Sequence, residues 1–126
     1  MGLDAERLKE IFAPLGAVTV KRMFGGAGIY FEGLCFAIES QGEVFLKVDD
    51  KNRSEFQAAG SRPFMYVMRG VPRETSYWLL VESAYDDPNE LRRWANLGRG
   101  AARRAAESKA PKKAAVKTKA KKAARR

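Results

Sequence analysis

The sequence predicts an α+β domain with a single, mainly antiparallel sheet of about six strands and helices packed on it. The expected order is one helix, four strands, one helix, two strands and one helix, followed by a disordered tail. Apolar residues recur at helical spacing near the N-terminus, and segments rich in aromatic and β-branched residues then alternate with glycine-containing turns. The composition changes to Ala, Lys and Arg near the C-terminus, so we expect one domain over residues 1–98 and a basic tail over 99–126.

The first helix is expected over residues 4–14, because Asp4 can cap its start and Gly16 can end it. Its apolar residues have the i, i+3, i+4, i+7 spacing of one helix face: Leu8, Ile11, Phe12 and Leu15. Four strands are expected next, joined by short turns as antiparallel hairpins: 18–23, 28–32, 34–39 and 43–48.

The second half of the domain begins with a short polar helix in DKNRSEFQAAG (50–60), which offers a capping acid at its start and Gly60 as its terminator. Strands over 63–69 and 76–82 follow, joined by a turn at Gly70-Val71-Pro72. The last helix is expected to open at Asp87-Pro88, with an N-cap acid and proline at the first helical position. Its inward face is expected to hold Leu91, Trp94 and Ala95, and Gly98 and Gly100 weaken its continuation.

The formal net charge of +9 is unevenly distributed along the chain. Residues 1–98 contain 12 Lys and Arg against 14 Asp and Glu, whereas residues 99–126 contain 12 Lys and Arg against the single acid Glu107. The tail also has no large apolar side chain after Glu107. Any affinity for polyanions should therefore reside in the tail.

Several segments resemble the TfoX N-terminal domain family, in the order and at the spacing of that family. They are KRMFGGAGIYF (21–31), FLKVDDKNRSEF (45–56), AAGSRPFMY (58–66), SYWLLVE and DDPNELRRWA, so the resemblance covers most of residues 3–97. It implies a compact bacterial α+β domain of a family associated with the regulation of natural competence, and it does not imply an enzyme. Longer competence regulators add a second helical domain, where this sequence has Lys and Ala.

Candidate catalytic and metal-binding groups have simpler structural interpretations. The GGAG glycines Gly25, Gly26 and Gly28 lack the helix and third glycine of a dinucleotide site and favour a bulge or a close strand crossing. The absence of histidine removes the usual general base, and Cys35 is expected to be a small buried residue. The acidic residues at the strand-to-helix junction are expected to cap the helix rather than hold a divalent ion: Asp49, Asp50 and Glu55. We therefore expect no catalytic site, metal or cofactor.

Two surface features of the domain are candidate binding sites. Lys21, Arg22 and Lys47 lie in strands and could share one exposed sheet face that binds phosphate or an acidic partner; the alternative is ordinary outward-facing strand cations. Tyr77 and Trp78 are adjacent in a strand and must point to opposite faces, so one of them could lie at an interface. A single sheet also has edges to cover, which favours a homodimer.

The tail carries the strongest chemical signal, because its cations resemble those of linker-histone tails. Such a segment binds DNA or RNA without sequence preference by releasing counterions. The expected phosphate contacts are Arg103, Arg104, Lys109, Lys112, Lys113, Lys117, Lys119, Lys121, Lys122, Arg125 and Arg126. The expected protein is a cytoplasmic regulatory or adaptor domain, nucleoid-associated through its tail, with a protein partner and no membrane. The alternative is a self-associating interaction module whose tail only confers solubility.

Overall fold

The computed structural model of the chain describes residues 3–23 and 25–116. Within them, six antiparallel strands form one sheet in the order β1-β2-β3-β4-β6-β5, and four helices accompany it. The elements are α1 (Ala5–Ile11), β1 (Thr19–Met23), β2 (Gly26–Phe31), β3 (Leu34–Ser40), β4 (Glu43–Lys47), α2 (Arg53–Ala58), β5 (Pro63–Met68), β6 (Val71–Leu79), α3 (Ser83–Asp86) and α4 (Pro88–Val116). The predicted α+β class with one antiparallel sheet is confirmed.

The first helix is shorter than the prediction over 4–14. Asp4 caps it as expected, since its Oδ1 accepts a hydrogen bond of 2.8 Å from the Arg7 amide, but α1 ends at Ile11. The chain then turns through Leu15 to Gly16, which has φ +143°. The short helix α3 was not predicted.

Three hairpin turns have the same backbone conformation. Each pairs a non-glycine residue with a glycine, both at positive φ: Glu32-Gly33, Gln41-Gly42 and Arg69-Gly70. Positive φ at both central residues is the type I′ geometry, whose twist matches that of the flanking strands. The last turn corrects the expected Gly70-Val71-Pro72 connection, because Val71 and Pro72 already belong to β6.

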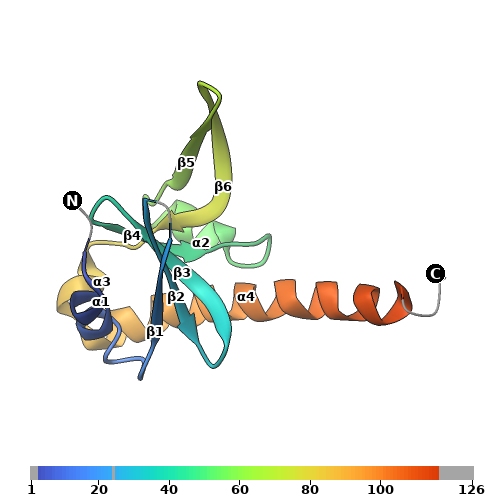
Figure 1. Cartoon of the computed structure of the whole chain (residues 1–126). Coiled ribbons are helices and arrows are strands. Elements are labelled where there is room, and N and C mark those ends of the chain that lie inside the picture. The colour runs from blue at the N-terminus through green and yellow to red at the C-terminus, as the bar shows by residue number, and fades with distance from the viewer. Residues whose placement is uncertain (1–2, 24, 117–126) are drawn as a thin grey trace.

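The core lies between the sheet and the helices. α4 lies across one face of the sheet against β3 and β4, while α1 and α3 gather near its N-terminal end (Figure 1). Phe12 contacts Phe36 edge to face at 5.2 Å, and Phe56 contacts Trp94 in the same way at 4.9 Å. The first contact joins the end of α1 to β3, and the second joins α2 to α4.

The glycines of the GGAG segment serve the backbone, as the structural interpretation expected. Gly25 has φ +70°, and a Cβ at Gly26 would come within 2.0 Å of the Glu39 carbonyl oxygen. The pairing of β2 with β3 also shifts register between Ile29 and Tyr30. These residues allow β2 to cross close to β3.

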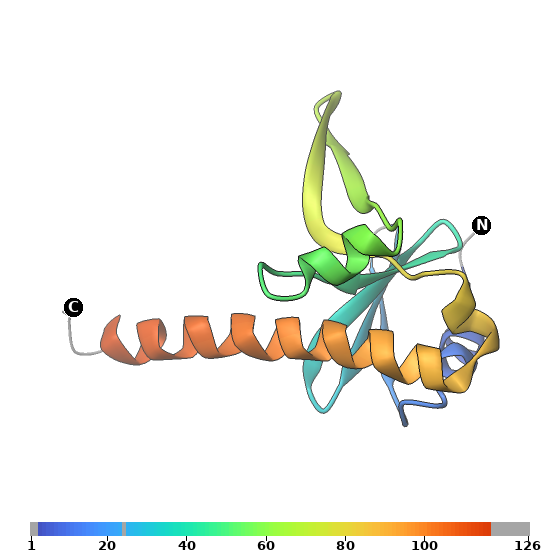
Figure 2. The same ribbon diagram turned by 180° about the vertical axis from the view of Figure 1, so that it is seen from behind.

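The expected domain boundary at residue 98 needs correction. α4 continues without interruption to Val116, and Ala101 and Ala102 beyond that boundary are buried. Residues 99–116 are therefore helical rather than disordered, and the folded domain includes at least the first of them. Residues 117–126 lie outside the described part of the chain. The far end of α4 projects well away from the sheet (Figure 2).

The hairpin of β5 and β6 extends beyond the rest of the sheet (Figure 1). The register of β4 with β6 covers residues 77–79, and the Val48 amide donates to the Ser76 carbonyl oxygen, so residues 64–75 form a two-stranded ribbon, which we call the arm. β6 begins at Val71, earlier than the predicted 76, because it includes the whole second strand of this ribbon. Pro72 is tolerated there because no third strand pairs with β6 at that level.

Candidate nucleic-acid interface and sheet-face sites

The start of α4 follows the local signal in the sequence. The helix begins at Pro88, and Asp87 Oδ1 accepts hydrogen bonds from the amides of Asn89 at 2.9 Å and Glu90 at 3.3 Å. The Glu90 side chain does not complete a reciprocal capping box: its Oε1 accepts a hydrogen bond of 3.1 Å from Trp94 Nε1. The cap and this side-chain contact fix the direction in which α4 leaves the domain core.

The docked part of α4 carries small residues at helical spacing. Its buried residues are Leu91, Trp94, Ala95, Gly98, Ala101 and Ala102. A Cβ at Gly98 would lie 3.2 Å from the Phe36 carbonyl oxygen and 3.3 Å from Leu46 Cβ. Gly98 thus lies where the helix approaches the sheet closely, rather than at the end of the helix.

Arg104 fastens α4 to the start of α2. Its guanidinium group donates to both oxygens of the Asp49 carboxylate, at 2.6 Å and 2.9 Å, in a two-pronged ion pair. The Arg104 hydrogen bond lowers the pKa of Asp49, and partial burial opposes that shift. The buried Asn52 side chain donates to the carbonyl oxygens of Lys47 and Leu97, joining β4 and α4 at the same point.

Of the three acids at this junction, Asp49 alone accepts backbone amides next to α2 among the described hydrogen bonds, and the N-cap residue of α2 is Asn52. Asp49 Oδ1 also accepts from the amides of Lys51 and Asn52 ahead of α2. The other two acids form ion pairs, Asp50 with Arg53 and Glu55 with Arg93, each at 2.8 Å. Among the described residues, no group of three potential metal ligands comes together.

Two of the predicted tail cations belong to the folded domain. Arg104 is engaged by Asp49, whereas Arg103 is exposed at the rim of a small hollow that Arg99 and Phe31 also line. The Arg99 guanidinium lies 4.5 Å from the centre of the Phe31 ring and forms a 2.9 Å ion pair with Glu32. Arg99 and Arg104 therefore stabilise the docking of α4.

The positive charge of the molecule is concentrated after residue 108, beyond the docked part of α4. Residues 1–108 contain 15 Lys and Arg and 15 Asp and Glu, so they are formally neutral. Residues 109–126 contain nine cations and no acid. Lys109, Lys112 and Lys113 lie on the last turns of α4. The other six lie outside the described residues: Lys117, Lys119, Lys121, Lys122, Arg125 and Arg126.

Lys21 and Lys47 lie on the sheet face that α4 leaves open. Each ammonium group lies over a tyrosine ring at 5.0 Å from its centre, Lys21 over Tyr30 and Lys47 over Tyr77. Cys35 lies between the two rings, with its Sγ 3.9 Å from the Tyr77 hydroxyl. We call these five residues the lysine–tyrosine face; burial, and next the neighbouring Cys35, raise the pKa of Tyr77.

Arg22 does not share this face. It follows Lys21 in β1 and points to the other side, where it donates to the Leu3 carbonyl oxygen at 2.9 Å and lies 3.6 Å from Glu39. Glu39 is buried, and its other carboxylate oxygen accepts from the amides of Leu3 and Gly42. The expected three-cation patch is thus reduced to two lysines.

The adjacent pair in β6 separates as the strand geometry requires. Trp78 is buried in the core, and Tyr77 is half-buried on the open face. Cys35 is also half-buried and donates to the Ala37 carbonyl oxygen at 3.4 Å, so it is less enclosed than the sequence suggested. Tyr77 and Cys35 therefore belong to the lysine–tyrosine face rather than to the core.

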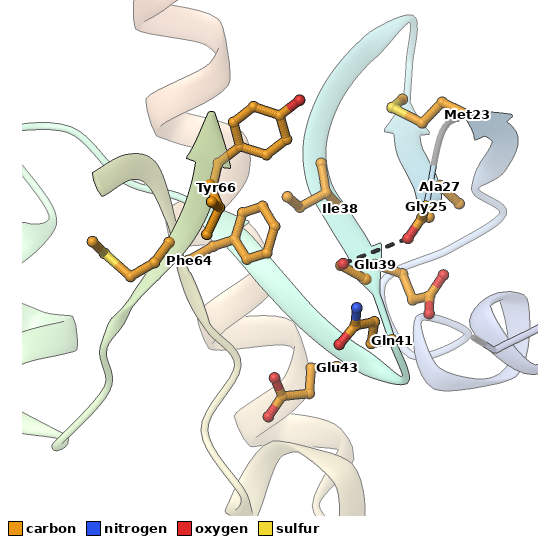
Figure 3. A pocket seen from close by; sticks show the side chains of 13 residues that line it. Met23, Gly25, Ala27, Ile38, Glu39, Gln41, Glu43, Phe64 and Tyr66 are labelled. Atoms are coloured by element: carbon orange, nitrogen blue, oxygen red, sulfur yellow. Dashed lines mark hydrogen bonds between the residues drawn. The ribbon is translucent and has the colours of Figure 1, made fainter. Parts of the chain in front are cut away.

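A groove of about 500 Å³ separates the arm from the ends of β2 and β3 (Figure 3). Phe64 and Tyr66 project from β5 towards Ile38 on the opposite wall. Ser40 Oγ donates to the Gly25 carbonyl oxygen at 3.5 Å along the floor. Nothing in the sequence pattern singled out this groove, because its walls come from strands whose packing angle only the fold defines.

A comparison with protein-family models shows which family the domain belongs to. The model of the TfoX N-terminal domain matches residues 10–102 of the chain. The chain belongs to the TfoX N-terminal domain family. The match ends at Ala102, so the family domain includes the buried alanines of α4 and stops before the basic segment.

Membership of the TfoX family suggests a competence-related regulatory domain. A comparison with curated proteins finds no match. Within the residues that the structure describes, no helix is both long enough and apolar enough to span a membrane.

Proposed function

We propose that this TfoX N-terminal domain is a non-enzymatic regulatory adaptor that binds nucleic acid through residues 109–126, without sequence preference. The main support for this proposal is the uneven distribution of charge between the domain and residues 109–126. A formally neutral domain is followed by nine cations with no acid among them. Such a segment gains affinity for a polyanion by releasing condensed counterions, and the neutral domain neither adds to that attraction nor opposes it.

α4 supports the proposal because it carries the first cations away from the domain. Among the residues of α4 up to Ser108, whose side chains the structure describes, Arg104 is the last that hydrogen-bonds to another element. The helix backbone nevertheless continues to Val116, past Lys109, Lys112 and Lys113. Nucleic acid can therefore approach these lysines without meeting the sheet.

The tail lacks the side chains that read bases in the major groove. Its residues after Glu107 include no Asn, Gln or aromatic residue. Lysines near phosphates position a protein on the duplex but carry no sequence information. In this proposal, any specificity comes from a protein partner of the TfoX domain, and the tail supplies only proximity to nucleic acid.

The test is an anisotropy titration of a labelled random duplex with the full-length protein over a series of salt concentrations. If roughly five to seven of the cations contact phosphate, the slope of log affinity against log salt should be about −5 to −6. Unrelated duplexes should compete almost equally. Binding that is absent at low salt would contradict the proposal.

Two full-length variants locate the binding site. In the first, the seven lysines between 109 and 122 are replaced by Gln, which keeps the length of the chain and should reduce affinity at least a hundredfold at moderate salt. The matched control is Lys21→Gln with Lys47→Gln on the lysine–tyrosine face, which should bind like the wild type. The opposite pattern would place the nucleic-acid site on the sheet.

A further inference from the structure

The two edges of the sheet differ in how they are protected. β1 carries Lys21 and Arg22 within the strand, and charged residues on an edge are a common device against strand pairing. β5, at the other edge, has no charged residue between Pro63 and Met68. Among the described strands, β5 pairs only with β6, so the backbone groups on its outer side are available to another strand.

The apolar side chains of this edge are exposed. Met65 is 46% exposed, Tyr66 51% and Val67 61%, and they are consecutive in β5. Val71, at the start of β6 in the same arm, is 51% exposed. Most of the large exposed apolar residues of the described chain thus lie on the arm, and such clustering is typical of an interaction surface.

The arm also lacks the support that the remainder of the sheet has. A two-stranded ribbon is marginally stable in water, and three or more strands are needed for independent stability. β4 supports β6 at residues 76–79, and Phe64 packs on Phe45 with ring centres 4.9 Å apart at the base of the arm. Beyond that base, the residues up to 75 form such a ribbon. A further strand added to β5 would complete the arm and cover its apolar edge at the same time.

We infer that β5 pairs with β5 of a second copy of this chain, antiparallel and about a two-fold axis at Tyr66. A two-fold pair places each residue opposite its mirror position along the strand. Pairing centred on Tyr66 sets 64 opposite 68 and Met65 opposite Val67. This is the longest symmetric pairing that keeps Pro63, which has no amide hydrogen, and the flanking Arg62 and Arg69 out of the paired run.

Charge permits a second copy as the partner. The paired run itself is uncharged in both chains. At each end of the run, Arg62 would lie near Arg69 of the second copy, but Arg62 already forms a 3.0 Å ion pair with Glu43. The nearest charged residue on the Tyr66 row is Arg73, its neighbour on β6. The two copies of Arg73 would lie three strand spacings apart, about 14 Å, which exceeds the Debye length of about 8 Å at physiological salt.

The first experiment measures the mass of the full-length protein in solution by light scattering, at about 0.5 M salt to keep nucleic acid off the tail. The mass should rise with concentration towards twice the chain mass of 14.0 kDa. Val67→Lys should keep it at the monomer, because a lysine on an edge strand opposes pairing. Met23→Lys is the matched control at the β1 edge, where Met23 is 49% exposed, and should dimerise like the wild type.

The second experiment tests the register by cysteine cross-linking in a Cys35→Ser background. Residues paired across antiparallel strands have Cα atoms about 4.5–5.5 Å apart, which a disulfide can span. Tyr66→Cys should therefore form a covalent dimer on mild oxidation. Arg73→Cys should not, because it lies three strand spacings from its copy. A wild-type monomer at every concentration, a dimer that survives Val67→Lys, or a dimer without the Tyr66→Cys cross-link would overturn the inference.

Discussion

The docked half of α4 and its projecting half share one continuous backbone but differ in composition. The docked half, residues 88–104, places Trp94, Gly98 and Ala101 against the sheet and ends at the ion pair between Arg104 and Asp49. The projecting half, residues 105–116, consists mainly of alanine and lysine. Tertiary packing stabilises the first half. The second half depends on backbone hydrogen bonds within the helix, and Pro111, which has no amide hydrogen, removes one of them. Helical conformation alone therefore does not delimit the domain.

Removing the largest side chain of the docked half should have the largest effect. Trp94→Ala should lower the free energy of unfolding by about 3–5 kcal/mol, because Trp94 is buried against Phe56 and hydrogen-bonds to Glu90. Chemical denaturation followed by circular dichroism measures this change. A cost below about 1 kcal/mol would show that the helix is not anchored there.

Two truncations locate the boundary between the halves. A chain ending at Gly98 should lose on the order of 2–4 kcal/mol of stability, because it lacks the buried Ala101 and Ala102 and the Arg104 ion pair. A chain ending at Ser108 should unfold within about 0.5 kcal/mol of the full-length protein. Equal stability of the two truncated chains would contradict the boundary drawn here.

The ion pair that ends the docked half should give a pH-dependent contribution. Because the folded-state pKa of Asp49 is lowered, its contribution is present above the unfolded pKa of about 3.9 and is lost as the pH falls through the folded-state value. Arg104→Gln should lower stability by on the order of 1 kcal/mol at pH 7, with this difference shrinking below pH 4. Stability measured across pH tests this, and Arg53→Gln, whose partner Asp50 is exposed, should show no comparable difference.

The smallest expected effects distinguish the two glycines of α4. Gly100→Ala should raise stability by about 0.5–1 kcal/mol through helix propensity, because its new Cβ would come closest to Arg104 Nη1, at 3.3 Å, and this nitrogen does not hydrogen-bond to Asp49. Gly98→Ala should not show that gain, since its Cβ would press on the Phe36 carbonyl oxygen and Leu46. Thermal melts of the two variants measure the difference, and an equal gain at both sites would show that α4 does not approach the sheet closely at Gly98.

The local signals in the sequence were sufficient for most elements of the fold. Asp4 and Asp87 cap helices as expected, and the glycine turns fix the hairpins of the sheet. The end of the domain was misjudged because Gly98 and Gly100 were interpreted as helix-weakening residues. A usable signal was present: 91, 95, 98 and 102 continue the i+3 and i+4 spacing of a buried face.

The site residues were less predictable, because their partners are distant in sequence. Arg104 and Asp49 are separated by 55 positions, and no local pattern pairs them. Lys21 and Lys47 share a face only because β2 and β3 lie between their strands, while Arg22 is excluded from it by strand alternation. The arm escaped prediction for the same reason, since only the sheet order shows that β4 stops short of it.

The projecting half of α4 would bind nucleic acid along its own length rather than at its far end. At about 1.5 Å of rise per residue, Lys109 lies roughly 8 Å beyond Arg104 and Val116 roughly 18 Å beyond it. A duplex bound by these lysines would therefore lie directly beside the domain. A protein captured there would be confined beside the duplex at an effective concentration in the millimolar range, so even weak recognition by the domain would suffice for occupancy.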